Sequence, residues 1–216
     1  MISILNAQIK PARRSKNHIV SSLSWALLII GGVALTYAVY AVSDTAAYQQ
    51  VELHKLESPN GASRVNFTTA QVMLNRPIIG EVIGELQVPR IGLRTIVVEG
   101  DSAKILLRAV GHIPSTAFPG QDGNIALAGH RDSLFLPLQQ IQQGDLVTFD
   151  SLGQQFQYEV FATQIVSPDD VGDLHATAGH ELTLITCFPF GFIGPAPKRF
   201  IVRAREIETR SLATFH

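Results

Sequence analysis

Cysteine is the scarcest informative residue in this sequence, because Cys187 is the single cysteine among 216 residues. One cysteine excludes a disulfide within the chain, and it excludes the zinc sites that are built from several thiolates. The seven histidines are scattered without the spacing typical of metal ligands. We therefore expect neither a metal site nor a cofactor.

Positive charge is also scarce beyond residue 80. Residues 81–216 hold ten Lys and Arg against fifteen Asp and Glu, although the net charge of the whole chain is only −1. Proteins that bind nucleic acid gather Lys and Arg on one face to contact phosphates. The acidic balance therefore argues against nucleic acid as a partner.

Charged residues are absent from Ile19 to Ser43. A helix of this length can cross the roughly 30 Å hydrocarbon core of a bilayer, so residues 19–43 are predicted to span a membrane. Cleavable signal peptides usually have apolar stretches of only about 7–15 residues, which favours an uncleaved anchor, although Ala41 and Ser43 leave cleavage open as an alternative. The four basic residues of segment 1–18 place that segment in the cytoplasm by the positive-inside rule and the remainder outside.

The chain after the span divides into three further parts. Residues 44–80 are predicted to form a stalk, with a short helix followed by a loop, and residues 208–216 are a C-terminal tail. Between them, residues 81–207 contain short runs rich in Val, Ile, Thr, Phe and Tyr at the spacing of a β-sandwich or closed barrel. The runs are "EVIGELQVP", "RTIVVEG", "GNIALAGH", "DLVTFDS", "QFQYEVFATQIVS", "ELTLITC" and "RFIVRARE". Two short helices are expected between strands, at 102–110 and 132–141, the second with Asp132 as a candidate cap.

The lone thiol lies at the end of one predicted strand, and Arg199 lies at the start of the next. If these strands pair as an antiparallel hairpin, Cys187 and Arg199 face each other across strands about 4.8 Å apart. A guanidinium favours a nearby thiolate and can also hold an oxyanion. Taken alone, Cys187 is equally compatible with an inert buried thiol or an intermolecular disulfide, and Arg199 with a surface residue.

A reactive cysteine also needs a proton-transfer partner. His130 ends the apolar run "NIALAG", so it is predicted to lie at a strand end, where a rigid scaffold holds an accessible side chain. His112 is the nearest rival, and His175 and His180 fall in a polar loop. Asp132 is a candidate for orienting His130 or for capping the following helix.

Three motifs resemble those of the sortases, the membrane-anchored cysteine transpeptidases of bacterial surfaces. "LAGHRD" is followed, 57 positions after its His, by the Cys of "TLITC", and an Arg comes twelve positions after that Cys. "TLITC", residues 183–187, matches the signature T-L-x-T-C without a mismatch, and "CFPFGFIGPAPKRFIVRA" is similar to the tail of the class D type. The resemblance covers about residues 81–207 and includes the anchor.

This resemblance implies an all-β fold, a closed eight-stranded barrel with one or two short helices. It implies a cytoplasmic-membrane enzyme with one span whose catalytic domain faces outward. Cys187 would be the nucleophile, His130 the proton donor and acceptor, and Arg199 the stabiliser of the transition state. The partners would be a surface protein with an LPXTG-like sorting signal, an amine acceptor and the lipid bilayer.

Substrate-binding candidates flank the thiol. Thr186 could bond a substrate backbone group, or it could simply be a β-branched strand residue. Phe188 and Phe190 could line a groove for the Leu-Pro part of a signal, and packing of their loop onto the barrel is the safer expectation. The calcium response of some sortases depends on acidic loop residues, and the acidic stretch "SPDDVGD" could act in the same way. This is weak evidence for calcium binding, because an acidic loop is usually just solvated.

Two other functions remain to be weighed against transpeptidation. A membrane-tethered barrel that binds peptides without turnover has no need of a Cys, a His and an Arg together. The L,D-transpeptidases also use these three residue types, but they place a Ser-x-Gly-Cys-x-Arg pattern around the thiol, whereas this chain has Leu-Ile-Thr-Cys-Phe.

Overall fold

The structure, a computed structural model, describes residues 16–57, 76–151, 153–173 and 179–207. The chain forms two compact units, residues 1–43 and 44–216, which are treated separately below. The predicted tail at 208–216, His175 and residues 58–75 of the predicted stalk lie outside the described residues.

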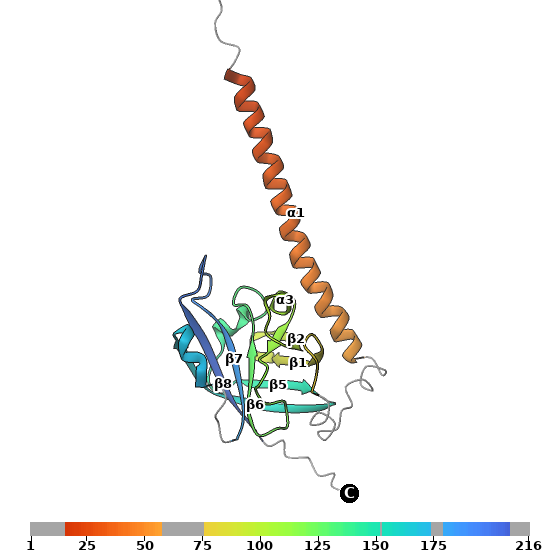
Figure 1. The fold of residues 1–216 in the computed structure, drawn as a ribbon, viewed down its shortest axis with the longest axis vertical. Coiled ribbons are helices and arrows are strands. Elements are labelled where there is room, and N and C mark those ends of the chain that lie inside the picture. The colour runs from red at the N-terminus through yellow and green to blue at the C-terminus, as the bar shows by residue number, and fades with distance from the viewer. Residues whose placement is uncertain (1–15, 58–75, 152, 174–178, 208–216) are drawn as a thin grey trace, which may run out of the picture. The chain divides into compact units, whose positions relative to one another are not determined.

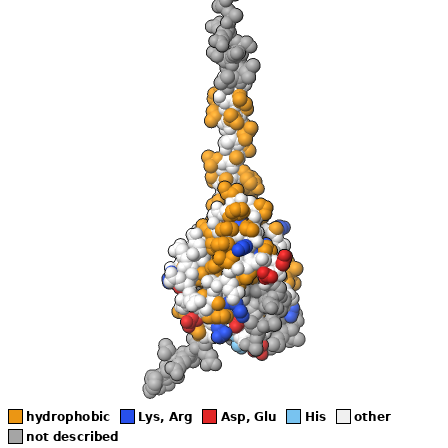
Figure 2. All heavy atoms as spheres, turned by 90° about the vertical axis from the view of Figure 1, so that its left-hand side faces the viewer, with side chains coloured by type: hydrophobic (Ala, Val, Ile, Leu, Met, Phe, Trp, Pro, Cys, Tyr) orange, Lys and Arg blue, Asp and Glu red, His pale blue; other side chains and the backbone are white. Residues whose placement is uncertain are grey.

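The first unit contains most of helix α1 (Lys16–Glu57). The part of the chain that the structure describes has one helix long and apolar enough to cross a membrane, between Ser21 and Leu56, with a mean hydropathy of 2.0. Its large apolar side chains between residues 23 and 42 are exposed, and the face drawn in Figure 2 carries no charged side chain along this segment. An exposed and uniformly apolar surface of this kind is suited to lipid rather than to water.

The second unit is built on a closed barrel of eight strands (Figure 1), which confirms the fold implied by the family resemblance. Around the barrel the strands follow the order β1-β2-β3-β4-β7-β8-β6-β5. Their bounds are β1 Val82–Val88, β2 Leu93–Glu99, β3 Val110–His112, β4 Gly123–Ala128, β5 Leu146–Ser151, β6 Gln154–Val166, β7 His180–Phe188 and β8 Lys198–Glu206. Two pairings are parallel, β2 with β3 and β4 with β7, and the other pairs are antiparallel.

Each of the seven runs identified in the sequence contains one strand, and the eighth strand, β3, had no run of its own. β3 is only three residues long and its first residue, Val110, fell inside the helix predicted at 102–110. That helix is shorter than predicted: α3 covers only Ala103–Leu106. β5 and β6 pair as an antiparallel hairpin, and Gly153 adopts a φ of 72° in the turn.

The short helix predicted at 132–141 is present only in its second half, and it is a 3-10 helix. The segment contains turns followed by a 3-10 helix, η2 (Leu136–Gln140), with Pro137 in its first turn. Phe135 precedes η2, and no side chain caps it, so Asp132 is not a helix cap. Two further 3-10 helices are η1 (Pro89–Ile91) and η3 (Pro168–Asp173).

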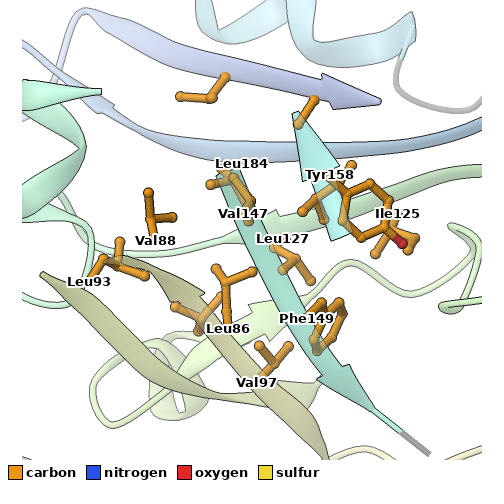
Figure 3. Packing of buried hydrophobic residues seen from close by; sticks show 14 of the residues in the cluster. Leu86, Val88, Leu93, Val97, Ile125, Leu127, Val147, Phe149, Tyr158 and Leu184 are labelled. Carbon is orange, nitrogen blue, oxygen red and sulfur yellow. The ribbon is translucent and has the colours of Figure 1, made fainter. Parts of the chain in front are cut away.

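One apolar cluster fills the barrel interior (Figure 3). Each strand contributes at least two buried residues to it, except β3, which contributes only Val110. Its most completely buried side chains include Leu86, Leu127, Phe149, Tyr158 and Leu184. Alternate residues of β7 and β8 point into this cluster, while the residues between them point outward, as the two-residue period of a strand requires. This alternation decides which side chains of β7 and β8 are available to a substrate.

The last part of α1, residues 44–57, belongs to the second unit and packs against β2. Gln49 is 8% exposed, and its carboxamide oxygen accepts a hydrogen bond from the Ile96 backbone N–H while its Nε2 donates to the Arg108 carbonyl. The segment therefore supplies a polar side chain to a stretch of β2 that β3 is too short to reach, because β3 pairs with β2 only from Val97 onward.

Candidate active site

Cys187 and Arg199 face each other in the β7–β8 pair, which confirms the register predicted from the sequence. Cys187 is a free, partly buried thiol one residue before the end of β7, and Arg199 is the second residue of β8. Cys187 and Arg199 form a row of paired residues across the sheet, and this row continues onto β6, where Val166 pairs with Arg199. The sulfur and the guanidinium therefore start from neighbouring backbone positions.

The parallel pairing of β4 with β7 brings His130 to the same end of the barrel. Every paired residue of β7 has a number 57 higher than its partner in β4, from Gly123 with His180 to Ala128 with Ile185. His130 and Cys187 are separated by the same 57 positions, two residues beyond the last pair. The motif spacing seen in the sequence is thus the register of this strand pair.

The outward face of the sheet carries both strand residues of the candidate site. Ile185 and Ile201 lie outside the interior cluster, in a small apolar group with Ala126. Cys187 and Arg199 are each two residues from one of these isoleucines, and two residues is the period with which strand side chains return to the same face. The thiol therefore faces away from the interior.

Thr186 joins the strand that carries Cys187 to the chain that leads to His130. Its side chain is 2% exposed, and its hydroxyl donates a 2.7 Å hydrogen bond to the Gly129 carbonyl. The Gly129 N–H in turn donates to the Ile185 carbonyl, at 3.1 Å. These contacts fix the two backbones together immediately before both candidate residues. Thr186 has a structural use here, and its contact with substrate stays a prediction.

The turn after His130 is packed from beneath by Phe135. A β-carbon on Gly129 would lie 2.6 Å from the Phe135 ring, so only glycine fits at this position without a shift. The Phe135 side chain is fully buried, and its N–H donates to the His130 carbonyl at 3.0 Å. The backbone of His130 is therefore held by the barrel interior, while its side chain stays partly exposed.

His112, the rival considered from the sequence, occupies a different environment. Its ring is fully buried, and its Nδ1 lies 2.6 Å from the Glu99 carboxylate. Its Nε2 contacts the Ala117 carbonyl and the Thr116 hydroxyl. Glu99 and His112 are partners in the β2–β3 pair. A ring with both nitrogens bonded and no exposure has no access to substrate, which leaves His130 as the better candidate.

The polar groups of the candidate residues are largely uncommitted. Within the described ranges, no side chain hydrogen-bonds the imidazole of His130 or the carboxylate of Asp132, and no carboxylate pairs with Arg199. Arg199 donates to the carbonyls of Ala196 and Lys198 through Nη1, at 3.4 and 3.1 Å. A guanidinium without a carboxylate keeps its charge and most of its donors for a ligand.

The aromatic residues that follow the thiol pack together on the barrel. Phe190 and Phe200 contact the interior cluster, and their rings lie 5.5 Å apart at the centroids. Phe188 is close to both, at 6.1 Å from Phe190 and 6.4 Å from Phe200. This arrangement agrees with the expectation of packing, and a role of Phe188 and Phe190 in substrate binding stays a prediction.

Arg131 is a residue of this region that the sequence reasoning passed over. It follows His130 and is only 7% exposed, although arginine is seldom buried. Its Nη2 donates to the carbonyls of Phe192 and Gly194 in the loop after β7. Its place inside the "LAGHRD" motif was the available signal, but nothing local indicated burial.

No metal centre is formed by the residues that the structure describes. No group of three or more His, Cys, Asp or Glu side chains among them is arranged to hold an ion. Asp169 and Asp170, part of the acidic stretch, lie exposed in η3.

Comparison with known proteins agrees with this geometry. The family model described as the sortase domain matches residues 86–207, which include His130, Cys187 and Arg199. Sortase D of Bacillus subtilis strain 168 is 31% identical over 191 residues, a match that covers 84% of this chain and 96% of that protein. Sortase A of Bacillus anthracis is 25% identical over 211 residues, covering 91% and 99% of the two chains.

Solved structures show the same architecture. The chain is similar to a sortase D5 transpeptidase from Clostridium perfringens, with a TM-score of 0.62, 27% identity, and coverage of 74% of this chain and 99% of that one. It is also similar to Listeria monocytogenes sortase A, with a TM-score of 0.53 and 26% identity, over 59% and 88% of the two chains.

Proposed function

The chain belongs to the sortase family, and from this premise we propose that it cleaves an LPXTG-like sorting signal after its Thr through a thioacyl-enzyme. The acyl group then passes to an amine, which anchors or polymerises a surface protein. The observation that carries the proposal is the alignment of Cys187 with Arg199 on paired strands, with His130 continuing the register of the strand beside them.

In the first step the Cys187 thiolate attacks the carbonyl carbon of the signal's Thr. A carbon–sulfur bond forms, and the negative charge moves to the carbonyl oxygen. Arg199 lies beside the sulfur in register and has no carboxylate partner among the described residues, so its donors can receive this oxyanion. The collapse of the intermediate breaks the peptide bond, and the imidazolium of His130 gives its proton to the leaving amine.

In the second step an amine attacks the thioester. The neutral imidazole of His130 takes a proton from the incoming amine, the carbon–sulfur bond breaks, and the thiolate is restored. Water in place of the amine gives hydrolysis as a side reaction. Each role is assigned to a side chain on a rigid strand end or on the turn that Phe135 holds, an arrangement that favours accurate placement of reacting groups.

Partly exposed aromatic side chains next to the thiol support a peptide substrate with an apolar segment. Ile185 and Ile201, two residues along their strands from Cys187 and Arg199, are almost fully buried and offer little surface of their own. Phe188 and Phe190 are partly exposed, and a Leu-Pro dipeptide would bury apolar surface against them, at about 25 cal/mol per Å². They are the proposed wall of the peptide groove on the side of the loop after β7.

The proposed location is the bacterial cytoplasmic membrane, with a single span and the barrel outside. The apolar part of α1 and the four basic residues before it support this orientation. The partners are the lipid bilayer, a surface protein that carries the signal, and an amine acceptor.

The test uses the full-length chain in detergent micelles and a library of LPXTG-like peptides. Mass spectrometry should detect an acyl adduct on Cys187 that disappears when an amine is added and a transpeptidation product accumulates. Cys187→Ala should bind the same peptides and form no adduct. If the parent protein returns only intact peptide across the library, the membrane-tethered binding barrel becomes the better reading.

A further inference from the structure

The loop between β7 and β8, residues 189–197, has little backbone hydrogen bonding to hold its tip. It is the blue connection that follows β7 in Figure 1. Three prolines restrict its φ angles and Phe190 packs on the interior cluster, but among the described residues no hydrogen bond between two backbone groups involves this loop. Ile193 at its tip is 96% exposed and Phe192 is 46% exposed. The position of the tip therefore depends on contacts with side chains from elsewhere.

Arg131 provides the largest share of those constraints. Its Nη2 donates to the Phe192 carbonyl at 2.6 Å and to the Gly194 carbonyl at 3.1 Å, and its guanidinium carbon lies 5.7 Å from the centre of the Phe192 ring. Hydrogen bonds from a charged donor are about twice as strong as neutral ones, and a cation over an aromatic ring adds a further attraction. One side chain thus holds three points of the loop tip.

Burial of the Arg131 guanidinium costs free energy, and an apolar side chain could pack against the loop without that cost. Arg131 is 7% exposed, no carboxylate pairs with it in the part of the chain that the structure describes, and its Nη1 is buried without an acceptor there. A buried cation without an anion is unfavourable relative to one in water, and a leucine or methionine would fill the same space without that cost. The charge therefore serves the carbonyls that it binds.

The backbone from which Arg131 projects is fixed by the same contacts that fix His130. The preceding Gly129 is hydrogen-bonded to Thr186 and Ile185 of β7, and the Phe135 N–H holds the carbonyl of His130. The side chain of Arg131 therefore extends from a rigid turn to a loop with little rigidity of its own. Gly194 receives it with a φ of 109°, a conformation that favours glycine.

We propose that Arg131 is a positioning residue that fastens the β7–β8 loop to the His130 turn, so that the loop forms one wall of the peptide groove in a fixed place. This inference rests on the proposed transpeptidation, but the contact itself can be tested without turnover. Arg131 acts on the peptide through the loop and does not touch the reacting atoms.

The kinetic test compares Arg131→Met, Arg131→Lys and Arg131→Gln with the parent chain in detergent. For a sorting-signal peptide, Arg131→Met should lower kcat/KM about tenfold, chiefly through a higher KM, because a charge-assisted hydrogen bond that orders the groove is lost. Arg131→Lys keeps the charge and should recover part of the loss, and Arg131→Gln should recover less. Arg205→Gln, on an exposed arginine of β8 away from the loop, is the matched control.

Alkylation of Cys187 by iodoacetamide separates positioning from a direct effect on the thiol. This small reagent does not need the groove wall, so its rate with Arg131→Met should equal that of the parent. A parallel fall in the alkylation rate would mean that Arg131 acts on the sulfur, and the proposal would be wrong.

Hydrogen exchange and a second variant test the contact from the other side. Amides of residues 190–197 should exchange faster in Arg131→Met, while those of β7 and β8 stay protected. Gly194→Ala should raise KM in the same way. The double variant should have a KM no higher than that of the more impaired single variant, since both substitutions disrupt the same contact between Arg131 and Gly194. Unchanged exchange in the loop, or additive effects on KM, would overturn the proposal. If the parent chain forms no acyl adduct, transpeptidation fails and the exchange result still decides the role of Arg131.

Discussion

Cys187 and Arg199 are cross-strand partners, so the thiol and the guanidinium of the candidate site are carried by backbones that pair directly with each other. Eleven residues lie between them along the chain, and the loop among these can change without moving either one. The barrel thereby separates two tasks. The strands hold the reacting groups, and the loop is free to shape what reaches them.

Replacement of Arg199 should reduce turnover far more than substrate binding. Arg199→Ala is expected to lower kcat about 100-fold or more, as loss of an oxyanion donor does, with a smaller change in KM. Arg199→Lys should fall between the parent and the alanine variant, because it keeps the charge and loses the planar fork of donors. Steady-state kinetics with a sorting-signal peptide measure this. Equal effects of both variants on KM, with kcat unchanged, would assign Arg199 to ground-state binding.

The two histidines that competed in the sequence should respond in opposite ways. His130→Asn is expected to lower kcat/KM by about 100-fold to 10,000-fold with little effect on unfolding. His112→Asn breaks the buried pair with Glu99 and should lower the free energy of unfolding by about 3 kcal/mol, while surviving folded protein keeps its turnover per molecule. Denaturant unfolding and active-site titration give both quantities. Loss of turnover in folded His112→Asn would contradict the assignment.

The hydroxyl of Thr186 should matter through Gly129 rather than through its own contact with peptide. Thr186→Val keeps the shape and removes the hydrogen bond, so we expect a loss of about 1 kcal/mol in unfolding free energy and a fall of several-fold in kcat. Thr186→Ser restores the hydroxyl and should recover most of both. If Thr186→Ser fails to recover kcat while Thr186→Val stays fully stable, the methyl group contacts the substrate instead.

The stability contributed by Asp145 should disappear in acid. The Arg90 guanidinium donates hydrogen bonds to this carboxylate, with help from the Gln142 N–H, and lowers the pKa of Asp145 below its usual value. Because the folded-state pKa lies below the unfolded one, the contribution is fully present above about pH 4 and is lost as the pH falls through the folded-state pKa. Asp145→Asn should unfold at lower denaturant than the parent at neutral pH, and the gap should shrink as the pH falls through the lowered folded-state pKa. A gap that is constant with pH would show that the charge contributes nothing.

Tyr158 carries a hydroxyl that the folded barrel does not use. The ring is fully buried in the interior cluster, and the hydroxyl has no hydrogen-bond partner among the described residues. Burial, with the nearby Glu206 carboxylate, raises the pKa of Tyr158. Tyr158→Phe should therefore leave stability unchanged or raise it by about 1 kcal/mol, as measured by denaturant unfolding. A clear loss of stability would reveal an acceptor for this hydroxyl.

The sequence pattern predicted the register of strands that are neighbours along the chain, but it did not predict which distant strands pair. Cys187 and Arg199 could be matched because a hairpin joins them, so their register follows from the ends of two strands. The pairing of β4 with β7 connects segments 57 residues apart. The strand-end position of His130 made it a candidate partner for Cys187, but only the family resemblance favoured it decisively over His112. No periodicity in either strand specifies that neighbour.

The differences between the predictions and the structure have physical causes, some local and some long-range. Residues 132–141 have helical spacing, but Phe135 is drawn into the barrel interior and Pro137 stops a regular helix from forming through it. Burial of Arg131 and the pairing of Glu99 with His112 depend on which strands become neighbours, and the composition of the surrounding sequence does not encode that choice.

Gln49 has a practical implication for anyone who shortens this chain. Its carboxamide occupies backbone hydrogen-bonding positions along β2 that the brief β3 leaves open. A truncation at the start of the barrel, near residue 81, would remove Gln49 and leave backbone groups of β2 unpaired and open to neighbouring molecules, which favours self-association. A fragment starting at Asp44 keeps Gln49 in place.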